Sequence, residues 1–262
     1  MTLALELCYD GSAYHGWQTQ KNAVTVQETL SKAIEKATGA WPSPELSGCG
    51  RTDAGVSALG YVASFRTDTK IPPDRFPMAI HSLLPPDISV RKARVVPNGF
   101  HARFSCIKKE YVYRLYHSFL PHPFERNYAA FRPYPFDIEL MRRAAADIAG
   151  THDFSAFCAS GSSVKTSVRT VFYCDVTGDE NHAEIRICAD GFLYNMVRIV
   201  AGTLVAVSEK KLPPDIVPTL LSSGDRTEAG ITLPPTGLRL EKVWYGDSPG
   251  LDGIGQNVKL FF

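Results

Sequence analysis

The sequence predicts an α+β protein built from two pseudo-repeated units of ferredoxin-like or RRM-like type, with mixed, largely antiparallel sheets. Three observations predict it: strands with alternating apolar residues, helices with an apolar stripe, and a strand–helix–strand–strand–helix–strand order that occurs twice. The length of 262 residues accommodates one or two domains with sizeable cores. We expect an N-terminal domain over residues 1–105, a C-terminal domain over 106–246 and a tail over 247–262.

The first half opens with a strand and a capped helix. Leu3–Tyr9 alternates as a strand does. In Thr25–Thr38 the apolar side chains form one stripe, Thr25 and Glu28 have the spacing of a capping box, and Gly39 follows the last turn. The other expected elements are strands at Glu45–Cys49 and Gly60–Phe65, a helix at Asp74–Leu84 and a strand at Ile88–Val96.

The second half repeats this order. A strand at Glu110–Tyr116 carries aromatic residues on one face, and a helix at Asp137–Ala149 is expected to be closed by Gly150. Gly161–Thr170, rich in Ser, Thr and Gly, is expected to be a mobile surface loop. The other expected elements are strands at Val168–Val176 and His182–Ala189, helices at 192–208 and Asp215–Ser222, and a strand at Leu238–Tyr245.

Composition excludes several classes of protein. Hydrophobic residues make up 44% and charged residues 21% of the chain, which is typical of a globular protein and argues against disorder. The six cysteines contain no C-x-x-C pair, which favours a reduced, cytoplasmic protein. The longest apolar stretch, Phe192–Val207, is too short to span a bilayer and contains Asn195 and Arg198, and the N-terminus does not resemble a signal peptide, so we expect no membrane segment.

The most informative stretch is a glycine-rich segment, Ser47–Val56, that carries Arg51 and Asp53. Its glycines permit tight turns and close approach to a ligand. It lacks the glycine spacing of a dinucleotide fingerprint and the Lys-Ser/Thr of a phosphate loop, so we expect no nucleotide cofactor. A tight turn with a surface ion pair is the alternative interpretation of this segment.

Arg198 is unusual because it lies inside an apolar helical stretch. A buried guanidinium needs a partner, since an unpaired buried charge costs several kcal/mol. Asp53 is the candidate partner, and such a pair would hold an aspartate ionised and fixed, ready to act as nucleophile or base. The alternative is an arginine whose side chain reaches solvent.

Charge is unevenly distributed although the net charge is only +1. Residues 91–114 contain seven basic residues and one acidic residue, a local balance of +6, interleaved with aromatic residues such as Phe100 and Tyr111. This mixture suits phosphate contacts and base stacking, and a solvated strand face is the alternative. The seven histidines show no metal-ligand spacing and there is no G-x-S-x-G motif, so we expect neither a metal nor a serine nucleophile.

Together these segments resemble the TruA family of tRNA pseudouridine synthases. The resemblance runs in order to about Tyr245 and rests on these motifs: Gly50-Arg-Thr-Asp-Ala-Gly-Val56; Tyr9-Asp-Gly-Ser12 with Gly16-Trp-Gln18 and Val26-Gln-Glu28; Phe100-His-Ala-Arg-Phe-Ser105 with Lys109-Glu-Tyr-Val-Tyr113; Phe192–Arg198; and Leu233-Pro-Pro-Thr-Gly-Leu238. Two positions depart from it: the family usually has histidine where this chain has Ser57 and glutamine where it has Tyr61.

The resemblance implies an activity and roles for residues. It implies two units facing a central RNA-binding cleft, a homodimer, and isomerisation of uridine to pseudouridine at positions 38, 39 and 40 in the tRNA anticodon stem-loop, with flipping of the target base. By resemblance Asp53 is the catalytic aspartate, Arg198 its ion-pair partner, and Tyr111 the aromatic residue that stacks on the uracil and takes up the C5 proton. The candidate substrate contacts are Arg51, His101, Arg103, Lys109, Tyr113 and Arg169.

Two functions from other classes compete with this one. A non-catalytic RNA-binding or chaperone protein would not need a buried Asp–Arg pair. A carboxylate-based glycoside or nucleoside hydrolase typically uses two carboxylates, and the glycine-rich segment supplies one. Isomerisation needs no redox change and no energy input, which agrees with the expectation of no cofactor.

Overall fold

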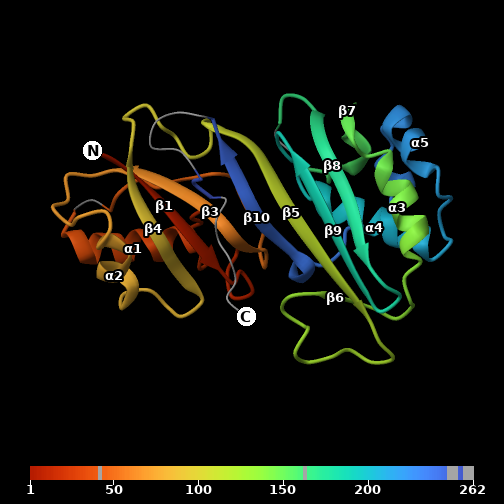
Figure 1. Ribbon diagram of the computed structural model, residues 1–262, viewed down its shortest axis with the longest axis horizontal. Helices are drawn as coiled ribbons and strands as arrows, with labels where there is room; N and C mark the ends of the chain where they lie inside the picture. The colour runs from red at the N-terminus through yellow and green to blue at the C-terminus, as the bar shows by residue number, and fades with distance from the viewer. Residues whose placement is uncertain (41–42, 162–163, 247–252, 256–262) are drawn as a thin grey trace. The chain divides into compact units, whose positions relative to one another are not determined.

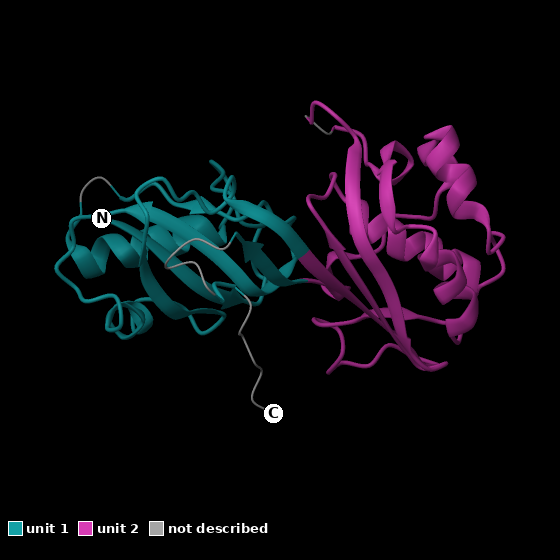
Figure 2. Ribbon diagram, turned by 45° about the horizontal axis from the view of Figure 1, so that its top comes forward, with its two compact units in different colours: residues 1–109, 240–262 teal, residues 110–239 magenta. Residues whose placement is uncertain are grey.

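The computed structural model describes residues 1–40, 43–161, 164–246 and 253–255, and the chain forms two compact units (Figure 2). Unit 1 comprises Met1–Lys109 and Leu240–Phe262, and unit 2 comprises Glu110–Arg239. Each combines a sheet with helices, so the expected α+β class is confirmed. No helix among the described residues is long and apolar enough to cross a membrane.

Unit 1 combines two helices with a sheet in which β1 pairs antiparallel with β3 and β4, and β2 pairs antiparallel with β3 (Figure 1). Its strands run in the spatial order β4-β1-β3-β10, and β2 adds to β3. Leu5 of β1 lies opposite Ala63 of β3 and Ala93 of β4, so one register fixes all three strands. The elements are β1 (Thr2–Tyr9), α1 (Val26–Thr38), β2 (Ser47–Gly48), β3 (Ser57–Arg66), α2 (Phe76–His81), β4 (Ile88–Val96) and β10 (Leu238–Tyr245).

Helix α1 forms where its pattern predicts, for the expected reasons. The Thr25 side chain accepts a hydrogen bond from the Glu28 backbone N–H, and Gly39 ends the helix with φ of 69°. Val26, Leu30, Ala33 and Ile34 are buried, so the apolar stripe faces the core. The expected helix at Asp74–Leu84 is shorter, because α2 starts beside Pro77 and ends ahead of the Pro85-Pro86 pair.

The tail expected over 247–262 lies mostly outside the described residues, but residues 253–255 contribute to unit 1. Ile254 is completely buried. The Gly255 N–H donates to the buried Glu6 carboxylate at 3.3 Å, and Arg94 forms an ion pair with the same carboxylate at 3.1 Å. This short turn therefore belongs to the packed part of the chain.

Unit 2 has strands in the spatial order β5-β9-β8-β7, and β6 pairs in parallel with β5. The β8–β9 and β7–β8 pairs are antiparallel, so the sheet is mixed but largely antiparallel, as expected. Figure 1 shows α3 and α4 close together beside β8 and β9. The elements are β5 (Cys106–His117), β6 (Ala130–Arg132), α3 (Ile138–Ala146), β7 (Gly150–Asp153), β8 (Val168–Gly178), β9 (His182–Ala189), α4 (Met196–Ser208) and α5 (Ile216–Ser223).

Three details of unit 2 differ from the sequence prediction. Helix α4 begins at Met196, four residues later than expected, because Asn195 adopts the left-handed conformation with φ of 60°. Helix α3 ends at Ala146, and Gly150 starts β7 instead of closing the helix. The expected loop at Gly161–Thr170 already enters β8 at Val168, and its residues 162–163 lie outside the described part of the chain.

Candidate active site

Asp53 lies on the loop that joins β2 to β3 in unit 1. Arg51 is exposed, Thr52 is buried and Asp53 is half-buried, so a charged side chain points outward on either side of an anchored residue. The Val56 N–H donates to the Asp53 carbonyl at 3.1 Å and closes a turn around the aspartate. The backbone at Asp53 is therefore held by a hydrogen bond, and its half-buried side chain remains partly accessible to a ligand.

A second segment of unit 1, residues 11–17, packs directly against this loop. The Trp17 N–H donates to the Thr52 carbonyl at 3.2 Å, and the Gly55 N–H donates to the Tyr14 carbonyl at 3.0 Å. A Cβ atom added to Gly16 would lie 2.3 Å from the Thr52 carbonyl oxygen, and Gly16 has φ of +83°. Only glycine permits this close approach in this conformation, which explains why Gly16 and Trp17 occur together in the opening motif.

Three aromatic rings lie beneath the loop: Tyr9, Trp17 and Tyr61, which we call the aromatic platform. The Trp17 and Tyr61 rings stack with centroids 4.2 Å apart, and the Tyr9 ring lies 5.5 Å from that of Tyr61. The Tyr61 hydroxyl donates to the Gly50 carbonyl, and the Tyr9 hydroxyl shares a 2.9 Å hydrogen bond with the Thr52 hydroxyl. The platform thus contacts the loop on both sides of Arg51.

The two departures from the family pattern have structural roles here. The Ser57 hydroxyl, which is buried, accepts a hydrogen bond from the Gly11 N–H at 3.0 Å. Tyr61 is completely buried in the platform. A Cβ atom on Gly48 would lie 2.0 Å from the Tyr61 hydroxyl, so this tyrosine requires glycine at position 48.

The neighbouring residue of the loop, Cys49, carries a buried thiol. Cys49 is completely buried, and this burial raises the pKa of its thiol to about 12. The thiol therefore stays protonated at neutral pH. Asp53, by contrast, is a half-buried carboxylate on the same loop.

Three further candidates of the basic region lie in unit 1. The Lys109 side chain runs near Gly50, because a Cβ atom on Gly50 would lie 3.4 Å from Lys109 Cε. His101 Nδ1 accepts hydrogen bonds from the N–H groups of Arg103 and Phe104, at 3.2 and 3.4 Å. These bonds fix a turn on which the Arg103 side chain is exposed, as expected for a residue that contacts RNA.

Arg198 in unit 2 is half-buried near the start of α4. Its Nε donates to the Leu233 carbonyl at 2.7 Å, and its Nη1 donates to the Asn195 side-chain oxygen at 2.6 Å. Asn195 is the residue whose left-handed conformation sets the start of the helix. The guanidinium is therefore held in place by groups on both sides.

Two tyrosines of β5, Tyr113 and Tyr111, contact the segments that follow Leu233 and precede α4. Tyr113 is completely buried, and its hydroxyl donates to the Pro234 carbonyl at 2.7 Å. Burial raises the pKa of Tyr113, although the charges of Arg198 and Arg132 act in the opposite direction. The Tyr113 hydroxyl thus holds the segment around Pro234, and the expected contact of Tyr113 with substrate stays a prediction. Tyr111 meets Phe192 edge to face, with centroids 5.0 Å apart.

Arg169, the remaining candidate, lies at the start of β8. Its Nη1 donates to the Thr166 carbonyl at 2.9 Å, and a Cβ atom on Gly191 would lie 3.4 Å from its Nε. Arg169 is half-buried and lies next to the residue that precedes Phe192. Unit 2 thus brings together parts of β5, the start of α4, the segment at 233–234 and the start of β8.

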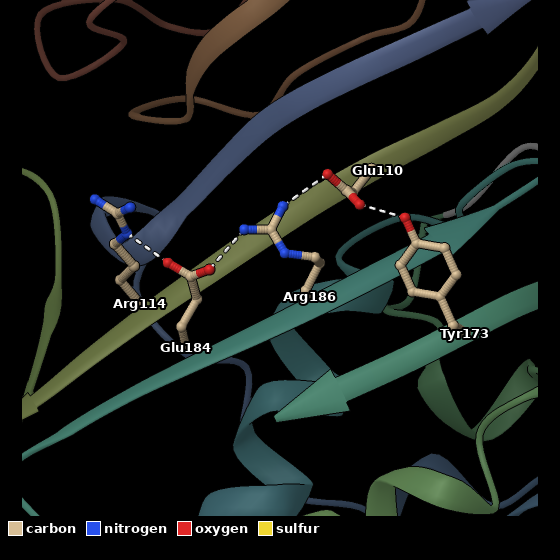
Figure 3. A network of polar contacts seen from close by, with 5 residues as sticks. All are labelled: Glu110, Arg114, Tyr173, Glu184 and Arg186. Atoms are coloured by element: carbon tan, nitrogen blue, oxygen red, sulfur yellow. Dashed lines mark hydrogen bonds and ion pairs between the residues drawn. The ribbon is translucent and has the colours of Figure 1, made fainter. Parts of the chain in front are cut away.

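Part of the +6 charge expected over residues 91–114 is neutralised by partners. Figure 3 shows Arg114 donating to Glu184, and Arg186 bridging Glu184 and the buried Glu110. Arg114 Nε lies 3.0 Å from Glu184, and Tyr173 donates to Glu110. Since Arg94 pairs with Glu6, the positive charge available to a phosphate is concentrated on fewer residues than the sequence count indicates.

The nine candidates divide between the units. Arg51, Asp53, His101, Arg103 and Lys109 lie in unit 1, and Tyr111, Tyr113, Arg169 and Arg198 lie in unit 2. The expected pair between Asp53 and Arg198 stays a prediction.

The supporting roles of Tyr9, Tyr61 and Asn195 were not predicted from the sequence. The glycines at positions 16 and 48 were the one sign in the sequence that other groups pack closely against the loop. Among the described residues, no group of three or more His, Cys, Asp or Glu side chains could hold a metal ion.

Comparison with known proteins places these features in a family. The profile of a family described as tRNA pseudouridine synthase matches residues 8–105 and 144–246. The chain is 52% identical to tRNA pseudouridine synthase A of Thermoanaerobacter sp. (strain X514) over 90% of this chain and 96% of the relative. It is 43% identical to the protein of that name from Bacillus subtilis (strain 168), over 94% of this chain and 99% of the relative.

A solved structure titled as a Cbf5-Nop10-Gar1 complex is similar with a TM-score of 0.41 at 12% identity, over 94% of this chain and 50% of that chain. The present chain therefore spans half the length of that one.

Proposed function

The chain belongs to the family of tRNA pseudouridine synthases, isomerases that act on uridine in tRNA, and we propose that it uses Asp53 to isomerise uridines 38, 39 and 40 of the anticodon stem-loop. This assignment of site and substrate needs no cofactor. The reaction breaks the N1–C1′ bond, turns the uracil and joins C5 to C1′; the C5 proton leaves to solvent and N1 takes up a proton, so the composition and mass of the uridine are unchanged.

One observation carries the proposal: the half-buried Asp53 carboxylate lies on a loop whose backbone is held by residues 11–17 and by the aromatic platform. A carboxylate with a fixed position can attack C6 or C1′ of the nucleotide as a nucleophile, or remove a proton at C2′ as a base. Each of these routes needs the reacting oxygen within about 3–3.5 Å of its target, which a mobile loop does not maintain.

We assign supporting roles to Arg198 and Tyr111. A guanidinium that pairs with Asp53 keeps the carboxylate ionised and oriented, and the bonds of Arg198 to Leu233 and Asn195 limit its own freedom. Tyr111 stacks on the target uracil and takes up the C5 proton. Its ring is buried and braced by Phe192, which suits a stacking role because a rigid aromatic side chain loses little conformational entropy on binding.

The remaining contacts concern the RNA. The target uridine must leave its stack before it can react, which costs a few kcal/mol. Exposed Arg51 and Arg103, with Lys109 and Arg169, offset this cost through contacts to phosphates and to the flipped nucleotide. We further propose that the enzyme works in the cytoplasm as a homodimer that holds one tRNA with both protomers.

The test is to map pseudouridine in tRNA incubated with the wild-type protein or with Asp53→Ala. We expect pseudouridine at positions 38, 39 and 40 with the wild type and unmodified uridine with the variant. Pseudouridine at these positions with both proteins would overturn the role of Asp53. Free uracil as a product would instead indicate a hydrolase, since isomerisation leaves the mass of the RNA unchanged.

A further inference from the structure

We propose that Tyr61 is a positioning residue for the catalytic loop, and that it acts through its hydroxyl rather than through its bulk. The proposal rests on the proposed function, because it assumes that Asp53 reacts. Tyr61 itself does not touch the substrate: it is completely buried in unit 1. Its influence passes through the hydrogen bond that its hydroxyl donates to the Gly50 carbonyl.

The hydrogen bond from Tyr61 to the Gly50 carbonyl lies close enough in the chain to Asp53 to influence the position of its carboxylate. Gly50 immediately precedes Arg51 and lies three residues before Asp53. Glycine has more backbone freedom than any other residue, and Gly48 and Gly50 flank Cys49 on this side of the loop. The Cys49 N–H donates to the Val62 carbonyl at 2.8 Å, so the hydrogen bond to the Gly50 carbonyl extends the restraint from the sheet one residue further toward Asp53.

A second tyrosine restrains the loop on the other side of Arg51. The Tyr9 hydroxyl and the buried Thr52 hydroxyl lie 2.9 Å apart, and Thr52 is adjacent to Asp53. Tyr9 and Tyr61 are on neighbouring strands, β1 and β3, and both rings contact Trp17. The sheet thus holds the loop at two points, through the hydroxyl groups of two tyrosines whose rings both pack against Trp17.

The ring and the hydroxyl of Tyr61 can be separated by experiment. The ring stacks on Trp17 at 4.2 Å, and phenylalanine keeps that stack. Tyr61→Phe removes the hydroxyl that donates to Gly50 and keeps the ring, so we expect the fold of unit 1 to be retained while the loop loses one restraint. Small displacements of a reacting group lower the rate of the chemical step without weakening binding.

The experiment measures single-turnover conversion of uridine to pseudouridine in tRNA at saturating enzyme, together with the Kd for tRNA and the thermal midpoint. For Tyr61→Phe we expect a rate constant about tenfold lower, a Kd within about twofold of wild type, and faster amide hydrogen exchange over residues 50–55. Thr52→Val removes the partner of Tyr9 without touching Tyr61 and is expected to behave in the same way. A lowered thermal midpoint for Tyr61→Phe would contradict the proposal, because the hydroxyl would then support the fold of unit 1 and not the loop alone.

Tyr116→Phe is the matched control. Tyr116 is a buried tyrosine of β5 in unit 2 whose hydroxyl accepts one backbone hydrogen bond, from His122 at 3.0 Å. We expect its rate constant to match wild type. A rate for Tyr61→Phe within twofold of wild type, an equal loss in Tyr116→Phe, or a defect confined to Kd would overturn the positioning role. Failure of the proposed function gives a different result, namely an active Asp53→Asn enzyme.

Discussion

Arg198 Nε donates a hydrogen bond to the Leu233 carbonyl at 2.7 Å, which ties the first turn of α4 to a segment 35 residues further along the chain. The Leu233 N–H returns a bond to the Arg198 carbonyl at 3.3 Å. The arginine is therefore part of the framework of unit 2 as well as a candidate member of the active site.

Replacing this arginine by an apolar residue should reduce both stability and activity. In Arg198→Met the Leu233 carbonyl and the Asn195 amide lose their donors, so we expect a loss of about 1–3 kcal/mol of unfolding free energy. Urea unfolding followed by far-UV circular dichroism measures this loss, and pseudouridine formation should fall by at least a hundredfold. If stability, tRNA binding and modification were all unchanged, a non-catalytic RNA-binding protein would be the better interpretation.

Gly16→Ala should destabilise unit 1. The added Cβ would lie 2.3 Å from the Thr52 carbonyl oxygen in a backbone conformation that alanine rarely adopts, so we expect a loss of about 2–3 kcal/mol. Trp17 and Trp244 belong to unit 1, so tryptophan fluorescence during urea unfolding reports on this unit.

The control for that substitution is Gly99→Ala, where an added Cβ would meet no atom within 4 Å. We expect its unfolding midpoint to stay close to that of wild type. Equal midpoints for Gly16→Ala and Gly99→Ala would contradict the close approach of residues 11–17 to the Asp53 loop.

Removing the exposed guanidinium of Arg103 should weaken tRNA binding in a salt-dependent manner. Each phosphate contact contributes roughly one unit to the slope of log K against log salt, so Arg103→Ala should lower that slope by about 1. Filter binding of labelled tRNA over a series of salt concentrations measures it. Arg75→Ala removes an exposed arginine next to α2 and should leave the slope unchanged; the opposite ranking of the two variants would be evidence against the contact.

Glu184 should make stability depend on acid pH. Burial tends to raise its pKa, but the hydrogen bonds and charges of Arg114 and Arg186 outweigh this and hold the pKa below its ordinary value. Because the folded-state pKa is the lower one, the stabilisation is complete above the unfolded value of about 4.3 and is lost as the pH falls through the folded value. The unfolding free energy should therefore decline with acidification in this window.

Glu184→Gln should flatten that decline, by less than about 1 kcal/mol because the pair is partly exposed to solvent. Chemical unfolding at several pH values below 6 or so compares the two proteins. Identical pH profiles for wild type and Glu184→Gln would show that the network in Figure 3 does not contribute to the pH dependence.

Much of the fold could be predicted from the sequence because local signals and tertiary packing agree. The expected bounds of β4, β9 and β10 are confirmed, and those of β1 and α1 differ by one residue. These segments have strong periodicity and clear caps. The prediction was wrong where one residue's conformation decides the boundary, as at Asn195 before α4, and it missed β6 and β7, which are short and lack alternating apolar residues.

The charged residues of the candidate site could be predicted from the sequence, but the residues that hold them in place could not. Arg51 and Asp53 stand out because charge on a glycine-rich loop is visible in the sequence. The hydroxyl groups of Tyr9 and Tyr61 are not visible in this way, since a tyrosine in an apolar strand reads as core. Likewise, the pairing of Arg114 with Glu184 depends on a strand register that joins residues 70 positions apart, so the local charge count overestimated the free positive charge.

The most direct test of the catalytic role of Asp53 is release of tritium from C5 when tRNA labelled at C5 of uridine is mixed with Asp53→Asn. We expect no release above the level without enzyme, while the Kd for tRNA stays within about threefold of wild type because the loop and its contacts are retained. Asp74→Asn, which alters an exposed aspartate next to α2, should release tritium at the wild-type rate. Release at the wild-type rate by Asp53→Asn would contradict the account.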